Sequence, residues 1–182
     1  MLQSLDFALI GVVSEKRWGT SFGQQFIKTL GFLGIIENIS AVYQFKPKGV
    51  RLGIPGELGM THMTFCILIQ LKDTEDWGQD FGRQVKTIAK ELSEDLGAKG
   101  VEVQILDFRS QFTMCKTVIL PYPHWLDREE FLYPSLEVLP KDYIHPVLNR
   151  PLLDFVTDES QWEDSAFLKT GHSLLAVDVE LD

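Results

Sequence analysis

The stretch Val101-Glu102-Val103-Gln104-Ile105-Leu106 alternates apolar and polar side chains, a pattern that is typical of a β-strand with one polar face. Side chains two residues apart on a strand share a face and lie about 7 Å apart, so Glu102 and Gln104 form a pair. A second apolar-rich run at residues 112–120 predicts the other arm of a hairpin. A segment rich in proline and aromatic residues follows at 121–134. A polar pair just before such a segment is the first candidate for a functional site.

The rest of the chain alternates between strand and helix patterns. Apolar periodicity predicts strands at 5–13, 39–45, 63–71 and 101–107, and helices at 21–32, 77–96, 127–133 and 149–156. The first of these helices starts with Ser21 and Gln24, whose spacing is that of a capping box. The order β-α-β-β-α-β-β predicts a single α+β domain of ferredoxin-like type, an antiparallel sheet with helices packed on it.

The negative charge of the chain is concentrated near its end. The 182 residues carry a net charge of −9, and residues 151–182 contribute eight acids against one lysine. We therefore expect a folded domain over residues 1–156 and an acidic extension over 157–182, in which Ser173–Leu181 has the pattern of an added edge strand. The sequence has no basic stripe, so a nucleic-acid partner is not expected.

The composition is that of a globular protein, with 45% hydrophobic and 24% charged residues. The apolar run Phe7–Val13 is too short to span a membrane, so no membrane partner is expected. Cys66 and Cys115 both lie in apolar runs, where we expect buried free thiols, and such thiols suit a reducing cytoplasm. The sequence leaves the oligomeric state open.

Three segments carry a resemblance to a known family. They are Ala8–Ser14, Ile39–Gly49, and a closing set made of Pro121, Pro123, Arg128, Phe131, Pro134 and Pro140. In this order, they resemble the 6-hydroxymethyl-7,8-dihydropterin pyrophosphokinases, enzymes of the folate pathway. The resemblance implies the same fold, a pterin substrate, and ATP with Mg²⁺. The pocket residues that it implies are Ser14, Tyr43, Phe45, Pro47, Tyr122, His124 and Phe131.

The chain departs from this family in the groups that handle ATP. The family has two aspartates where this chain has Glu102 and Gln104, and Mg²⁺ prefers anionic oxygen ligands, so Glu102 is the one candidate metal ligand. The arginine-rich loop that precedes this strand in the family is reduced to Gly97–Gly100, with Lys99 as its only cation. The candidates for catalysis are Glu102, Gln104, Lys99 and Arg128.

Two functional hypotheses follow. The first is a divergent homologue, poorly active or inactive, that needs no cofactor and keeps a pocket for a small pterin-like or anionic ligand or acts in protein interaction. The alternative is an active pyrophosphokinase that uses Mg²⁺ and ATP in a rearranged site built on Glu102, Lys99 and Arg128. The candidates also have a purely structural interpretation, in which Arg128 forms an ion pair and Tyr43 and Phe131 belong to the core.

Overall fold

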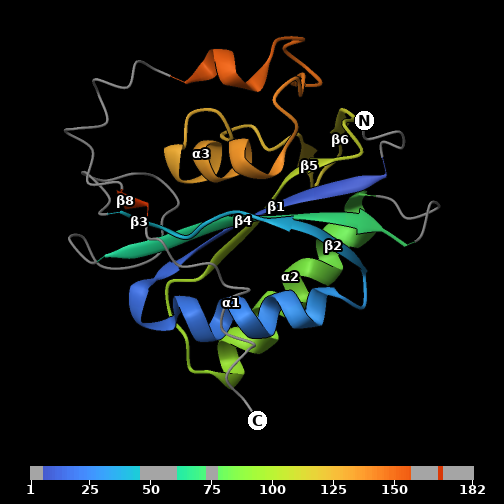
Figure 1. Ribbon diagram of the computed structural model, residues 1–182. Coiled ribbons are helices and arrows are strands. Elements are labelled where there is room, and N and C mark those ends of the chain that lie inside the picture. Colours follow the sequence, from blue (N-terminus) through green and yellow to red (C-terminus); the bar gives the residue numbers. More distant parts are fainter. Residues whose placement is uncertain (1–5, 46–60, 73–77, 157–167, 170–182) are drawn as a thin grey trace.

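The computed structural model describes residues 6–45, 61–72, 78–156 and 168–169, and its centre is an antiparallel β-sheet with helices on both faces (Figure 1). Helices α1 (Lys16–Leu30) and α2 (Gly78–Asp95) cover one face, and α3 (Glu129–Val138) covers the other. This arrangement confirms the predicted α+β domain of ferredoxin-like type. No helix in the described ranges is long and apolar enough to cross a membrane.

The sheet places its two longest strands at the centre. Its strands are β1 (Phe7–Glu15), β2 (Gly34–Ile39), β3 (Tyr43–Phe45), β4 (His62–Leu71), β5 (Glu102–Phe108) and β8 (Leu168–Lys169). They lie in the order β5-β1-β4-β3-β8, β2 also pairs with β4, and every pairing is antiparallel. Strand β1 is buried along its whole length because helices cover both of its faces, which explains its continuous apolar run.

Each face of the sheet has its own apolar core. On the α1 and α2 side the core includes Phe26 and Phe81, and on the α3 side it includes Trp125 and Phe131. Gly11 in β1 lets the Phe131 ring lie directly on the sheet, because a Cβ at Gly11 would come within 2.5 Å of Phe131 Cδ1. The missing side chain at Gly11 therefore sets how closely α3 approaches β1.

Helix α1 begins earlier than the sequence predicts. It starts at Lys16, directly after β1, and its N-cap residue Glu15 makes no capping side-chain bond, so the capping box predicted at Ser21 is wrong. The backbone N–H of Lys16 instead donates to the carbonyl of Thr61 at 2.9 Å. A tertiary hydrogen bond thus satisfies one backbone donor at the true start of the helix.

The single strand predicted at 39–45 corresponds to β3 and to the last residue of β2, which begins earlier, at Gly34. The backbone N–H of Ala41 donates to a carboxylate oxygen of Glu137 at 2.8 Å, and Ser40 exchanges hydrogen bonds with Cys66. These tertiary partners interrupt the strand, and the register of β2 also shifts beside β4. Alternation in the sequence does not reveal such a break, because the side chains on both sides of it keep a period of two.

The hairpin predicted from 101–107 and 112–120 is wrong. Strand β5 pairs with β1, and the second run forms two short strands, β6 (Thr113–Met114) and β7 (Ile119–Leu120), which pair with each other. Met114 and Ile119 are 70% and 45% exposed, so the run contacts the core only through its end, where Leu120 is buried and Val118 packs against the core. Its free thiol, Cys115, is half-buried rather than buried, whereas Cys66 is buried as expected.

Helix α3 continues through Pro134 to Val138, beyond the end predicted at 133. A proline at this position lacks the N–H that would bond the carbonyl of Glu130 one turn earlier. That carbonyl instead accepts a hydrogen bond from the Thr64 hydroxyl at 2.5 Å. The helix therefore passes the proline without leaving a buried acceptor unsatisfied.

Two further predictions concern the end of the chain. The helix predicted at 149–156 is a short 3-10 helix, η1 (Leu152–Phe155). The edge strand predicted at Ser173–Leu181 lies outside the described residues, although β8 is described just before it. The division into a domain at 1–156 and an extension at 157–182 stays a prediction.

Candidate functional site

Arg128 and Glu102 form a two-pronged ion pair on the α3 side of the sheet. The guanidinium Nη1 and Nη2 donate to Oε1 and Oε2 of Glu102 at 2.6 and 2.8 Å. The side chains are 9% and 10% exposed. Such charge-assisted, paired hydrogen bonds are the strongest kind that side chains form. Glu102 comes from β5 and Arg128 from the residue before α3, so the pair ties the edge of the sheet to the start of the helix.

Further groups close around the Arg128 guanidinium. Its Nε donates to Oε1 of Glu130 at 2.7 Å, and Glu130 is fully buried. Its Nη1 also lies 3.4 Å from the hydroxyl of Tyr122. The guanidinium carbon is 4.3 Å from the ring centre of Phe131, within the range of a cation–π contact. The nitrogens of Arg128 are thus all directed at groups of this chain.

The charges of this cluster depend on one another. Burial acts to lower the pKa of Arg128, but its hydrogen bonds and charge interactions with Glu102 and then Glu130 outweigh burial and raise the pKa above its usual value. One buried guanidinium therefore forms ion pairs with two buried carboxylates. Removing Arg128 takes the cation away from both buried carboxylates, which is costly.

The residues at this position do not fit the Mg²⁺ that the resemblance implies. Magnesium takes anionic oxygen ligands in octahedral geometry. Both oxygens of Glu102 accept hydrogen bonds from Arg128, and Oε1 accepts a further one from the amide of Gln104 at 3.0 Å. Among the described residues, no group of three or more His, Cys, Asp or Glu side chains is placed to hold a metal ion. Here a guanidinium neutralises the carboxylate that we considered as the metal ligand.

The aromatic residues that we considered for a ligand pocket are packed in the core. Phe131 is fully buried, and Tyr43 and Phe45 are 7% and 5% exposed. The hydroxyl of Tyr43 donates to a carboxylate oxygen of Glu137 in α3. Burial is the larger cause and this hydrogen bond the smaller cause of a raised pKa of Tyr43. A planar ligand would reach these rings only if they moved from their present contacts.

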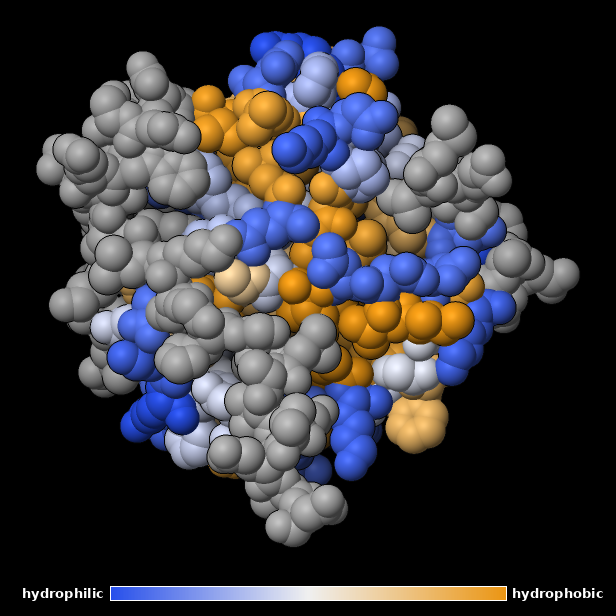
Figure 2. Space-filling view, in the orientation of Figure 1, coloured by the Kyte–Doolittle hydropathy of each residue, from blue (hydrophilic) through white to orange (hydrophobic). Residues whose placement is uncertain are grey.

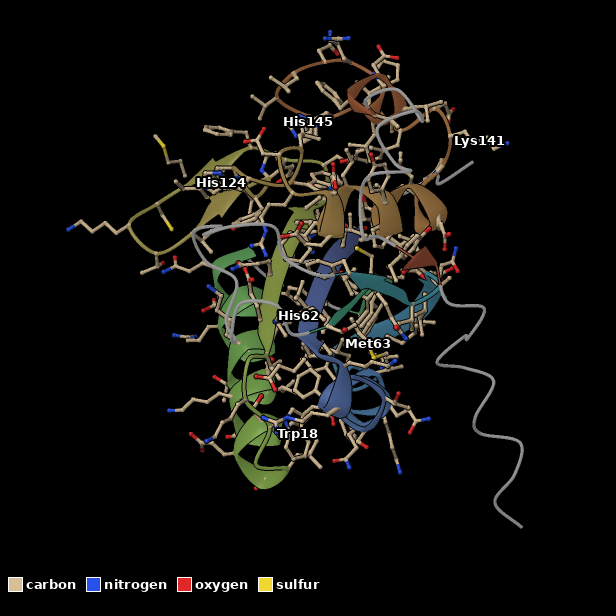
Figure 3. All side chains as sticks on the ribbon, turned by 90° about the vertical axis from the view of Figure 1, so that its left-hand side faces the viewer. Trp18, His62, Met63, His124, Lys141 and His145 are labelled. Carbon is tan, nitrogen blue, oxygen red and sulfur yellow. The ribbon has the colours of Figure 1, made fainter. Side chains whose placement is uncertain are left out.

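The other predicted pocket residues do not gather at one place. Ser14 is buried, and in β1 it has the same parity as Ile10 and Val12, which face the core on the α1 and α2 side. The side chain of His124 is 67% exposed, and Figure 3 shows it beyond the edge of the sheet. Pro47 lies outside the described residues. Ser14 is therefore separate from the Arg128 cluster, whereas the exposed His124 touches it only through the ring of Tyr122, 5.8 Å away between ring centres.

Adjoining hollows run along α2 and the edge of β5, and Lys86 lines three of them. One, of about 590 Å³, lies between α2 and the turn that carries Lys99, and it reaches Glu102. Another, of about 220 Å³, reaches Gln104 and Tyr122 beside the β6–β7 hairpin. Cationic side chains along a groove attract anionic ligands. Lys99 is thus a candidate that the structure places at an open groove.

Sequence analysis missed two acidic residues of this region, Glu130 and Glu137. Glu130 follows Arg128 by two residues at the start of α3, where an acid is favoured by the helix dipole, so this position gave a weak signal. Glu137 binds Ala41, and a contact between residues so far apart in sequence leaves no local pattern. Glu137 thus acts through a tertiary hydrogen bond, whereas the side chain of Glu130 binds Arg128 two residues away.

The fold and the site together define a class of protein. It is a ferredoxin-like α+β domain in which a polar strand pair, Glu102 and Gln104, meets an arginine from a proline-rich closing segment. Comparison with known proteins finds a relative among the pterin pyrophosphokinases. A curated relative, the 2-amino-4-hydroxy-6-hydroxymethyldihydropteridine pyrophosphokinase of Aquifex aeolicus, is 27% identical over 124 residues, which cover 66% of this chain and 71% of the relative. No family model matches the chain.

Solved structures of Plasmodium falciparum HPPK-DHPS share the fold. The wild-type structure with pterin and p-hydroxybenzoate has a TM-score of 0.62 and 11% identity, and the match covers 88% of this chain and 45% of that chain. Another wild-type structure has a TM-score of 0.61 and 11% identity, with 82% and 40% covered. This chain therefore spans less than half the length of these structures. The chain is thus similar in sequence to a pterin pyrophosphokinase and shares the fold of the HPPK-DHPS structures.

Proposed function

We propose that this protein is a divergent member of the family that does not catalyse ATP-dependent pyrophosphoryl transfer and that keeps a site for a small anionic ligand. One observation carries the first half of the proposal. The guanidinium of Arg128 binds both carboxylate oxygens of Glu102, at 2.6 and 2.8 Å, and the amide of Gln104 binds one of them. Both oxygens of the Glu102 carboxylate therefore bind groups of the protein itself.

The chemical argument concerns charge. Phosphoryl transfer is catalysed mainly by positioning the reactants and by neutralising the charge on the transferred group, usually with metal ions. Both oxygens of Glu102 already accept hydrogen bonds from the Arg128 cation, which competes with a metal ion for them, and Gln104 is neutral and makes a poor ligand. Without that neutralisation, we expect a loss of about 3 kcal/mol or more in transition-state stabilisation.

The second half of the proposal concerns the ligand. The groove along α2 and β5 offers Lys86 and Lys99, and one arm of it reaches Gln104. These groups favour a negatively charged ligand over a neutral planar ring. The Plasmodium structure cited above contains pterin, but in this chain the buried Phe131 and Tyr43 leave a pterin-like ligand as the less favoured occupant.

An assay for AMP formed from ATP and 6-hydroxymethyl-7,8-dihydropterin tests the loss of catalysis. We expect no product above background, with or without Mg²⁺. The competing hypothesis is an active pyrophosphokinase that uses Glu102, Lys99 and Arg128 in a rearranged site. Turnover in the ordinary enzyme range, about 1–10³ s⁻¹, would support that hypothesis and contradict ours.

Titration calorimetry with inorganic pyrophosphate and with a non-hydrolysable ATP analogue tests the ligand class. We expect binding that does not require Mg²⁺ and that weakens about tenfold in Lys86→Ala, because one charge-assisted contact is removed. Lys28→Ala, an exposed lysine on α1, is the matched control and should bind as wild type does. Binding that vanishes without Mg²⁺ would show that Glu102 is free to hold a metal ion.

A further inference from the structure

Residues 140–156 follow α3 and form a lobe on its outer side, away from the sheet (Figure 1). Within the lobe the chain turns back on itself, because Ile144 and Pro151 form an antiparallel β-bridge. Val147 and Leu148, in the turn that this bridge closes, are 50% and 46% exposed. Figure 2 shows apolar side chains among polar ones on this part of the surface. The conformation of the turn therefore decides how these apolar side chains are presented to solvent.

His145, which Figure 3 shows in this lobe, holds the turn together. Its Nδ1 accepts hydrogen bonds from the backbone N–H groups of Val147 and Leu148, at 3.3 and 3.2 Å. Its own backbone N–H donates to the carbonyl of Arg150, and its carbonyl accepts from the N–H of Asn149, both at 2.9 Å. Asn149 has a φ of 51°, which is uncommon for a residue other than glycine. Four hydrogen bonds of one residue thus close the turn.

The atom that binds the turn is also the atom that takes up a proton. A neutral imidazole carries one N–H and one acceptor nitrogen. Because Nδ1 of His145 accepts two hydrogen bonds, the N–H is at Nε2, and a second proton can add only at Nδ1. A protonated Nδ1 is a donor, and here it would face two other donors. A proton therefore competes with the backbone amides of Val147 and Leu148 for the same lone pair.

The imidazole ring of His145 lies in a buried, aromatic environment. The residue is 5% exposed, and the centre of its ring lies 5.6 Å from that of Trp125 and 6.2 Å from that of Phe155. Burial lowers the pKa of His145 below its ordinary value of about 6.5. Among the described residues, the charged and titratable groups of the surrounding segments pair with one another and form no hydrogen bond or ion pair with this ring: Tyr143 with Asp107, Arg150 with Asp154, and His124 with Asp127.

We propose that the 145–150 turn is a pH-sensitive element of the fold, in which a proton at Nδ1 of His145 releases the backbone amides of Val147 and Leu148 and opens the turn. Above about pH 6.5 the ring is neutral and the turn is closed. As the pH falls through the lower pKa of the folded state, both hydrogen bonds are lost, together with the stability that they contribute. This inference does not rest on the proposed function, because His145 belongs neither to the Arg128 cluster nor to the groove along α2.

Amide hydrogen exchange on the full chain, followed by NMR at about pH 7.5 and about pH 4.5, tests the proposal. The measured quantity is the protection factor, the ratio of the exchange rate of an unstructured peptide at the same pH to the observed rate. We expect the protection factors of Val147 and Leu148 to fall about tenfold or more at the lower pH, over the range in which the ring signals of His145 titrate. The amide of Leu132 in α3, which donates to the carbonyl of Arg128 at 2.9 Å, should stay protected.

Two variants separate the acceptor from the ring. His145→Asn carries an amide oxygen on Cγ, as histidine carries Nδ1 there, so it keeps an acceptor that takes up no proton, and both amides should be equally protected at the two pH values. His145→Phe keeps a ring beside Trp125 but has no acceptor, so the amides of Val147 and Leu148 should be unprotected at both pH values. His124→Asn removes an exposed histidine and is the matched control, with the pH dependence of the wild type expected.

Three results would overturn the proposal. The first is a wild type in which His145 titrates while Val147 and Leu148 stay protected, or in which His145 stays neutral at the lower pH. The second is a pH dependence that persists in His145→Asn. The third is a loss of protection at Leu132 together with the turn, which would show that acid unfolds the domain as a whole rather than opening this turn.

Discussion

The hydroxyl of Tyr143 donates a hydrogen bond of 2.7 Å to Asp107, a fully buried carboxyl in β5. Burial raises the pKa of Asp107, and the hydrogen bond from Tyr143, together with weaker ones from Phe108 and Ser110, offsets this only in part. The folded protein therefore holds a proton on Asp107 more tightly than the unfolded chain does. This difference couples folding stability to pH.

We expect Asp107→Asn to remove this coupling. A carboxyl whose folded pKa is raised contributes stability that is fully present below its unfolded pKa, about 3.9, and is lost as the pH rises through the folded pKa. The amide carries no charge and still accepts a hydrogen bond from Tyr143. The free energy of unfolding of the variant should therefore increase relative to that of the wild type as the pH rises from 4 to 7. Urea unfolding at several pH values measures this, with the exposed Asp95→Asn as the control. A variant whose free energy of unfolding falls relative to that of the wild type as the pH rises would contradict this prediction.

The Arg128 cluster predicts a large loss of stability on truncation. Arg128→Ala leaves Glu102 and Glu130 buried without their cation, so we expect a loss of about 3–5 kcal/mol in the free energy of unfolding. The control is Arg83→Ala, which breaks an ion pair with Asp80 whose side chains are 75% and 49% exposed. Such a surface pair contributes about 0–1 kcal/mol. Equal effects of both substitutions would show that the Arg128 cluster is more hydrated than the structure indicates.

The contact of Gly11 with Phe131 predicts an overpacking effect. A methyl group at Gly11 would lie 2.5 Å from Phe131 Cδ1, so Gly11→Ala should cost about 1–3 kcal/mol. Adding Phe131→Leu should recover part of this loss, because the two sites couple directly. Gly82→Ala is the matched control, since its nearest neighbours would be 3.8 Å away and alanine favours the helix by about 1 kcal/mol. Additive effects at Gly11 and Phe131 would contradict the contact.

The sequence predicted the layers of this fold better than its connections. Strands buried on both faces and helices with one apolar face leave a periodic pattern, and β1, β4 and α2 appeared near their predicted positions. The break between β2 and β3 depends on the bond from Ala41 to Glu137, and helix α3 passes Pro134 because Thr64 supplies a hydrogen bond. Such long-range partners leave no periodic signal.

The sequence named three residues that the structure brings together, but it did not predict how they bind one another, and their role in a site stays a prediction. Glu102, Gln104 and Arg128 were each identified, and the structure places them in hydrogen-bond contact. Their pattern alone did not show that Arg128 binds both oxygens of Glu102, because that depends on how α3 docks on β5. The contacts of Arg128 with Glu102 and Glu130 are those of an ion-pairing residue, as in the structural interpretation of this residue. The charge of Glu130 inside the core, which completes the cluster, was not foreseen.

The same geometry predicts how a metal site would have to be rebuilt. Gln104→Asp restores a second carboxylate on the strand, but both oxygens of Glu102 stay with Arg128, so we expect no gain in thermal stability from millimolar Mg²⁺. Arg128→Lys replaces a two-pronged donor by a single ammonium and frees a Glu102 oxygen. The double variant Gln104→Asp with Arg128→Lys should therefore show a Mg²⁺-dependent rise in Tm, measured by differential scanning fluorimetry, and Arg128→Lys alone should not. A rise in Gln104→Asp alone would show that Arg128 releases Glu102 readily, which would remove the observation on which the proposed loss of catalysis rests.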